Sequence, residues 1–112
     1  MEIVSVSITG PDVDWLAGHA RKLVEERLAA CGNIFPAIRS IYRWQGAVED
    51  EPEAYLLLHT RAEHVPAIIE RTDVEHPYDT VQILATRIVA ADPAYCDWIA
   101  AETSPAGTLL TT

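Results

Sequence analysis

Residues 33–61 read NIFPAIRSIYRWQGAVEDEPEAYLLLHTR, and this stretch decides the fold because it predicts one long β-hairpin. Gln45 and Gly46 lie between two arms, and glycine supplies the positive φ that a two-residue hairpin turn requires. Pro36 cannot donate a hydrogen bond to a partner strand, so it predicts an edge or a β-bulge early in the first arm. The turn also predicts the cross-strand partners near the tip, which are Trp44 with Ala47, Tyr42 with Glu49, and Ser40 with Glu51.

The two arms are longer than a domain of this size can cover. Each arm of about a dozen residues spans roughly 40 Å at ~3.3 Å per residue. A compact chain of this length has a radius of gyration of only ~13 Å. We therefore expect part of the hairpin to overhang, with unpaired backbone groups and with Ile41, Tyr42 and Trp44 exposed. Aromatic side chains on such a surface suit an oligomer interface, so the hairpin predicts a homo-oligomer.

The segments around the hairpin predict an α+β fold. The expected elements are a strand over residues 3–8, a helix from Asp12 or Asp14 with apolar side chains up to Leu28, the hairpin, a helix over about 63–73, a strand over 82–89, and a last helix that Asp92 caps and Pro93 opens. Gly32 is the expected terminator of the first helix. This β-α-β-β-α-β order is the ferredoxin-like arrangement, in which two helices pack on one face of an antiparallel sheet, with a C-terminal helix added. Residues 1–102 are expected to form a single domain, and residues 103–112 a flexible tail.

The composition excludes several classes of partner. The 112 residues carry a formal net charge of -9 with only 8 Lys and Arg, which argues against nucleic acid. The N-terminus lacks the features of a signal peptide, and no segment has the ~20 apolar residues of a membrane helix. We therefore expect a cytoplasmic protein without a membrane partner. The two cysteines, Cys31 and Cys96, form no CxxC pattern and predict reduced thiols.

Four short motifs occur along the chain, namely RLAACGNI at 27–34, SIYRWQG at 40–46, HPYD at 76–79 and DW at 97–98. In order and spacing they resemble the CutA family of divalent-cation tolerance proteins over residues 2–102. The resemblance implies a homotrimer of ferredoxin-like protomers whose long hairpins join sheets between subunits. It also implies an association with copper and divalent-metal tolerance, and a similarity in shape to the PII signalling proteins.

The resemblance further implies a pocket at subunit interfaces that uses a Trp, an acidic residue and a Lys. The matching positions are Trp44, Glu51 and His59, so an imidazole replaces the ammonium group. Gln45 and Gln82 are two further departures, because both stand where the family commonly has Glu. In an unbroken strand His59 shares a face with Glu51, and the expected register adds Trp44 to that face. A neutral imidazole there can bind a transition metal, whereas the alternative is a hydrogen-bonded histidine that fills a lysine slot.

The candidate metal ligands are Cys31, His76 and His59. A Cys31 thiolate suits soft Cu(I) and His76 adds an imidazole, although the sequence contains no spaced cluster of ligands. The alternatives are a buried cysteine that packs as a small apolar side chain and a turn histidine before a proline. His19 and His64 lie in predicted helices without partner ligands, so we expect them to face solvent. No tightly bound cofactor is expected, and copper or another divalent metal is the candidate ion.

No motif for a catalytic triad, a phosphate-binding loop or a zinc protease occurs, so no catalytic residue is predicted. Glu51 and His59 are the only acid/base pair that an enzyme would use. The leading interpretation is a trimeric divalent-cation and copper tolerance protein that binds metal ions weakly. The alternative is a PII-like signalling or scaffold trimer that holds a small anionic ligand or a protein partner in the intersubunit cleft. An anionic ligand requires a basic lining, for which the chain offers chiefly Arg39, Arg43 and Arg61.

Overall fold

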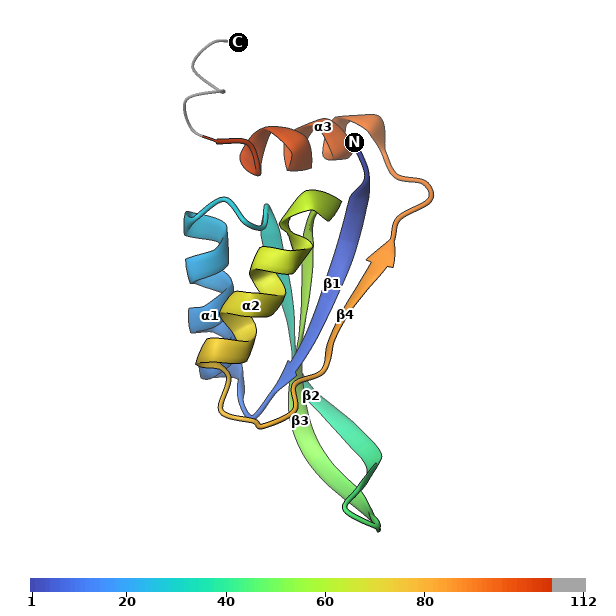
Figure 1. Ribbon diagram of the computed structural model, residues 1–112. Helices are drawn as coiled ribbons and strands as arrows, with labels where there is room; N and C mark the ends of the chain where they lie inside the picture. Colours follow the sequence, from blue (N-terminus) through green and yellow to red (C-terminus); the bar gives the residue numbers. More distant parts are fainter. Residues whose placement is uncertain (106–112) are drawn as a thin grey trace.

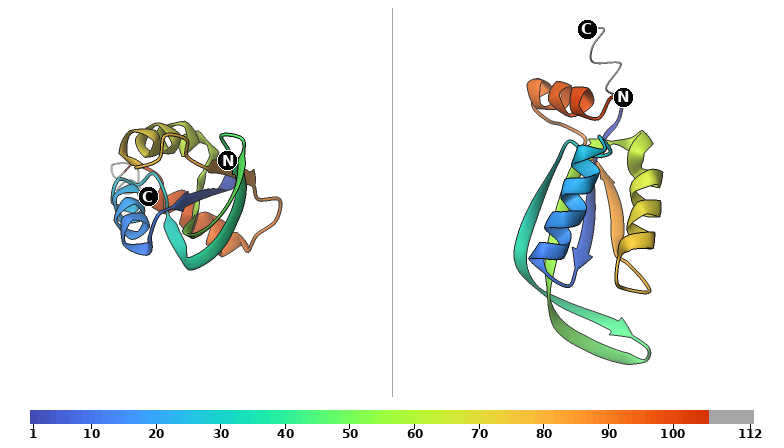
Figure 2. Two further views of the ribbon diagram at one scale, coloured as in Figure 1. Left: turned by 90° about the horizontal axis from the view of Figure 1, so that it is seen from below. Right: turned by 90° about the vertical axis from the view of Figure 1, so that its left-hand side faces the viewer.

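The computed structural model describes residues 1–105 and confirms the predicted α+β fold (Figure 1). Its elements are, in order, β1 (Ile3–Gly10), α1 (Val13–Glu25), β2 (Cys31–Trp44), β3 (Ala47–Arg61), the short 3-10 helix η1 (Ala62–His64), α2 (Val65–Glu75), β4 (Ile83–Arg87) and α3 (Pro93–Glu102). The strands form one antiparallel sheet in the order β2-β3-β1-β4. Helices α1 and α2 cover one face of this sheet, and α3 lies across one end of it (Figure 2). Within residues 1–105, no helix covers the other face along most of its length.

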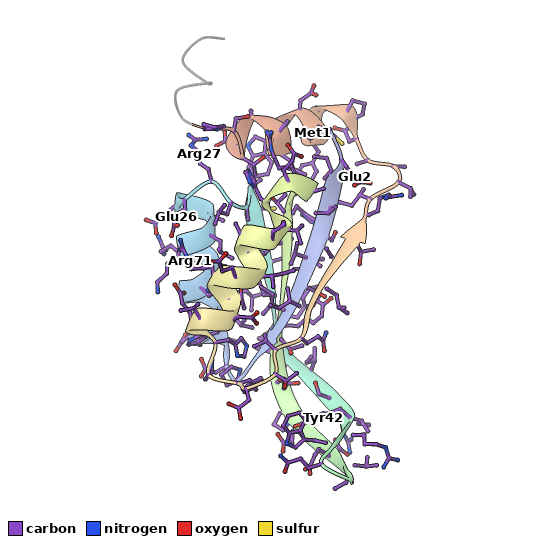
Figure 3. The ribbon with its side chains drawn as sticks, viewed as in Figure 1. Met1, Glu2, Glu26, Arg27, Tyr42 and Arg71 are labelled. Carbon is purple, nitrogen blue, oxygen red and sulfur yellow. The ribbon has the colours of Figure 1, made fainter. Side chains whose placement is uncertain are left out.

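The core lies between the sheet and the two covering helices. Side chains alternate along β1 and β3 and recur with the helical period along α1 and α2, so each element presents one apolar face inward. An ion pair at the surface also joins the helices, since the Arg71 guanidinium donates to both Glu26 carboxylate oxygens at 2.5 and 2.6 Å (Figure 3). The largest fully buried core side chains are Val6, Ile8, Leu16, Leu23, Leu56, Leu58 and Ile68.

The β2–β3 hairpin has the register that the sequence predicts. Its pairs include Trp44 with Ala47, Tyr42 with Glu49, and Ser40 with Glu51. The turn residues Gln45 and Gly46 both have positive φ, at 49° and 84°, as the common two-residue hairpin turn requires. The pairing shifts between Phe35 and Ile38. Pro36 lies inside this irregularity, which confirms its predicted place at a bulge.

The tip of the hairpin extends beyond the rest of the molecule, as expected (Figure 1). The chain measures 54 × 28 × 22 Å with a radius of gyration of 15.1 Å, above the ~13 Å of a compact chain of this length. β1 pairs with β3 only as far as Ala54, so among residues 1–105 the segment 47–53 has a strand partner on one side alone.

Gly32 does not end the first helix, and this prediction was wrong. Helix α1 ends at Glu25, and Arg27 takes the left-handed conformation with φ of 62°. The Leu28 and Arg27 amides then donate to the Leu23 and Val24 carbonyls at 2.9 and 3.1 Å, the paired bonds of a Schellman motif. Gly32 instead lies in β2 under α1, where a Cβ would meet side chains of Leu56, Leu58 and Ala20 at 3.0, 3.2 and 3.3 Å.

The other boundaries differ from the predicted ones by a few residues. Asp12 and Asp92 cap α1 and α3 by accepting hydrogen bonds from the Trp15 and Tyr95 amides at 2.8 and 3.2 Å. Helix α2 follows the 3-10 turn and runs further than predicted, and β4 is shorter. Thr103, the first residue of the predicted tail, is buried and accepts a hydrogen bond from Arg61; residues 106–112 lie outside the described range. Within that range no helix is both long and apolar enough to span a membrane.

The close approach at Gly32 yields a test of the packing between α1 and the sheet. We expect Gly32→Ala to lower the free energy of unfolding by about 1–3 kcal/mol, because the added methyl group overpacks the contact. Gly18→Ala is the matched control, since a Cβ at Gly18 meets nothing within 4 Å and alanine favours a helix by up to about 1 kcal/mol. Denaturant unfolding of both variants measures the difference. Equal stability of the two variants would refute the packing role of Gly32.

Candidate functional site

Three polar side chains meet where α3 crosses the end of the sheet. Cys31 of β2 and His59 of β3 are direct cross-strand partners, so their side chains lie on the same face. The Cys31 Sγ atom is 3.4 Å from His59 Nδ1 and 3.2 Å from the Tyr95 hydroxyl of α3. His59 Nδ1 is 3.1 Å from the same hydroxyl. We refer to Cys31, His59 and Tyr95 as the Cys-His-Tyr cluster.

The surroundings of the cluster set its chemistry. Burial lowers the pKa of His59 below its ordinary value of 6.5. The hydrogen bond with Cys31, reinforced by burial, raises the pKa of Tyr95 to about 12. The Tyr95 ring also stacks on Trp98, with 5.5 Å between the ring centroids. The cluster therefore combines a sulfur, a ring nitrogen and a phenol oxygen at a half-buried position that solvent still reaches.

His76, the third predicted metal ligand, does not join this cluster. It is buried at the end of α2, where its Nε2 donates to the Thr9 carbonyl at 2.8 Å and its Nδ1 accepts from the Tyr78 amide at 3.1 Å. Both ring nitrogens thus bond to the backbone, which matches the turn role that the sequence left open. Within residues 1–105, no three His, Cys, Asp or Glu side chains gather into a metal site.

The prediction that His19 faces solvent was wrong. Its exposed fraction is 2%, and its Nε2 lies 2.8 Å from Thr72 Oγ1 while its Nδ1 lies 3.3 Å from a Glu75 carboxylate oxygen. The sequence held a signal for this, because His19 stands three residues after Leu16 and four before Leu23 in the apolar stripe of α1. His64 is likewise not free in solvent, since its Nε2 bonds to the Thr103 carbonyl at 2.7 Å.

A second candidate site is a pocket of about 650 Å³ between the hairpin and residues 77–82. Trp44 and Glu51 both line it, and Gln82 lines it too. Tyr42, which projects from the hairpin in Figure 3, belongs to the same lining. His59 does not, because the eight residues that separate it from Glu51 place it about 26 Å further along β3. Within one chain, Trp44 and Glu51 therefore lie in this pocket and His59 lies in the Cys-His-Tyr cluster. The grouping of all three residues in a pocket between subunits stays a prediction.

The pocket is acidic. The Tyr78 hydroxyl donates to a Glu53 carboxylate oxygen at 3.1 Å, and burial together with this carboxylate raises the pKa of Tyr78 to about 12. The described lining contains Glu51, Glu53 and Asp79 but no Lys, Arg or His. The arginines proposed for an anionic ligand are engaged elsewhere in two cases: Arg39 binds the Asp50 carboxylate at 2.8 and 2.7 Å, and Arg61 binds residues at the end of α3.

Tyr95 is the functional candidate that the sequence reasoning missed. Tyr95 lies in the last predicted helix, and nothing in its neighbours along the chain points to Cys31. The contact arises because α3 crosses the end of the sheet and contacts β3 there. Only the tertiary arrangement brings this hydroxyl to the sulfur.

Comparison with known proteins assigns the chain to a family. Residues 4–102 match the family model described as CutA1 divalent ion tolerance protein. The divalent-cation tolerance protein CutA of Thermus thermophilus is 44% identical over 94 residues, which are 84% of this chain and 91% of that protein. Protein CutA of Mus musculus is 38% identical over 92 residues, or 82% of this chain, but these span about half (52%) of the mouse protein.

Solved structures agree with this assignment. The structure of the divalent cation tolerance protein from Thermus thermophilus has a TM-score of 0.83 and 44% identity, with 88% of this chain and 95% of that chain covered. The crystal structure of CutA from Xylella fastidiosa has a TM-score of 0.88 and 38% identity, with 93% and 100% covered.

Buried His19 predicts a pH-dependent stability. Burial lowers its pKa below the ordinary value of 6.5, although Glu75 opposes the shift. As the pH falls below about 6.5, the unfolded chain therefore binds more protons than the folded chain, and the free energy of unfolding decreases. We expect His19→Gln to flatten this dependence between about pH 5 and 7 in denaturant titrations. Part of the slope remains, because the pKa of His59 is lowered as well; an unchanged slope would contradict the role of His19.

Proposed function

The chain belongs to the CutA1 divalent ion tolerance family, and we propose that it acts as a homotrimer that serves metal tolerance by binding divalent cations weakly. The observation that carries the trimer is the overhanging hairpin. Ile41 and Val48 share one face of this hairpin and have exposed fractions of 67% and 63%. Such a pair of large apolar side chains on a projecting ribbon suits contact with another copy of the chain.

The free strand edges support the same proposal. Residues 47–53 of β3 lack a second strand partner, and β2 and β4 each pair on one side only in the described chain. A hairpin from one copy that docks on a sheet edge of the next makes a head-to-tail contact, which closes into a ring in a symmetric oligomer. The family resemblance implies that this ring has three subunits.

The chain offers side-chain atoms that can bind a metal ion. The Cys-His-Tyr cluster offers the kinds of atoms that bind borderline and soft cations, and the net charge of -9 favours cations over anions near the surface. The PII-like alternative with a small anionic ligand has less support, because the Trp44 and Glu51 pocket is lined by carboxylates. No catalytic step is proposed, and the cytoplasm is the proposed location.

The trimer has a direct test in Ile41→Asp. We expect the wild type to sediment as a trimer at micromolar concentration and Ile41→Asp to dissociate, because the interface would have to bury an unpaired carboxylate. Val74→Asp adds the same charge at an 80% exposed position of α2 and is expected to remain trimeric. A monomeric wild type would overturn the assembly.

Metal binding is tested on the whole, reduced protein. Equilibrium dialysis against Zn²⁺ is expected to show saturable binding that a chelator reverses. Binding that rises linearly with Zn²⁺ without saturation is the signature of a general attraction to an acidic surface, and it would remove the metal-binding part of the proposal. The trimer would stand in that case, since sedimentation tests it independently.

A further inference from the structure

We propose that Cys31, His59 and Tyr95 form a binding site for a thiophilic divalent cation of the Zn²⁺ type, an inference that rests on the proposed metal-binding function. Cys31 Sγ and His59 Nδ1 are the two strong ligands, the Tyr95 hydroxyl is a third, weaker contact, and solvent fills the remaining position. The site is distinct from the acidic pocket near Trp44 and does not include His76.

The spacing of the donor atoms fits one shared ion. Zinc bonds of about 2.0–2.3 Å in a tetrahedral site place nitrogen, oxygen and sulfur ligand atoms roughly 3.3–3.6 Å apart. The corresponding distances here are 3.4 Å from sulfur to nitrogen, 3.2 Å from sulfur to oxygen and 3.1 Å from nitrogen to oxygen. Small side-chain rotations therefore suffice to admit an ion between them, and no movement of the strands is needed.

The backbone holds the two strong ligands ready for an ion. Cys31 and His59 are paired residues of neighbouring strands, so the sheet fixes their separation before any ion arrives. Tyr95 lies in the first turn of α3, where the Asp92 cap and the stack on Trp98 position its ring. Donors on regular elements lose little conformational freedom when a ligand binds, which favours binding.

The donor set selects the class of cation. Sulfur and imidazole nitrogen are ligands of zinc and of soft transition metals, whereas Mg²⁺ and Ca²⁺ require oxygen ligands. Structural zinc sites have four protein ligands, so a site with two strong donors and an open position binds more weakly. Weak, exchangeable binding is what the proposed function calls for. The family resemblance implies that a lysine is usual at position 59. The positive charge of a lysine ammonium group would occupy the place where the His59 ring nitrogen can bind an ion.

Cobalt(II) reports on the site because a bound thiolate gives it a ligand-to-metal charge-transfer band. We expect the reduced wild-type protein titrated with Co²⁺ to develop this band and Zn²⁺ to abolish it. Cys31→Ser is expected to lose the band, and His59→Lys to weaken Co²⁺ binding at least tenfold while keeping the fold. Cys96→Ser is the matched control and is expected to keep both the band and the affinity. Tyr95→Phe, which retains the ring, is expected to show the smallest loss.

Thiol labelling covers the case in which Cys31→Ser fails to fold. In the wild-type protein, Zn²⁺ is expected to slow alkylation of Cys31 and leave that of Cys96 unchanged, as peptide mass spectrometry can measure. A charge-transfer band that survives in folded Cys31→Ser, or Zn²⁺ protection of Cys96 instead of Cys31, would overturn the site while leaving saturable Zn²⁺ binding in place. Absence of saturable Zn²⁺ binding in dialysis would overturn the site and the metal-binding function together.

Discussion

The pairing of β2 with β3 is the constraint on which the other features depend. Side chains alternate between the two faces of a strand, so a slip of one residue would turn every side chain of one arm to the opposite face. Cys31 and His59 would then lie on different faces, and the buried face of β3 would point to solvent. The turn at Gln45 and Gly46 sets the register at one end. The burial of Leu56 and Leu58 against the helices sets it at the other.

The β-bulge at Pro36 allows both ends of the hairpin to keep their own register. Between Phe35 and Ile38 the pairing shifts. The side chains on each side of the shift can therefore keep the strand face that their own part of the hairpin requires. A bulge also increases the local twist and bends the strand, and the hairpin bends away from the sheet in this region (Figure 2). The base of this hairpin carries Cys31 and His59 of the Cys-His-Tyr cluster. Its tip carries Ile41, Val48 and one wall of the acidic pocket.

The features that short-range sequence patterns determine could be predicted from the sequence. Turn chemistry and alternation gave the order of elements, the hairpin register, the bulge at Pro36 and the caps at Asp12 and Asp92. Gly32 was misassigned because glycine both ends helices and permits close packing, and only the tertiary contact with α1 distinguishes these roles. Glu51 and His59 share a strand face, but eight residues at ~3.3 Å separate them by about 26 Å within one chain, so only a pocket between subunits could bring them together. The contact of Tyr95 with Cys31 could not be predicted, because it required the position of α3.

Both apolar burial and polar contacts hold α3 in that position. Helix α3 buries only Ile99 fully, in a small cluster with Ile3 and Ala30 that is separate from the main core. Its C-terminal end is held by Arg61, whose guanidinium donates to the Ala100 carbonyl at 2.5 Å and to Ser104 Oγ at 2.9 Å. Arg61 is the last residue of β3, two positions beyond His59. The same strand therefore supplies one donor of the cluster and the anchor of the helix that brings the Tyr95 hydroxyl to it, so the geometry of the site is coupled to the docking of α3.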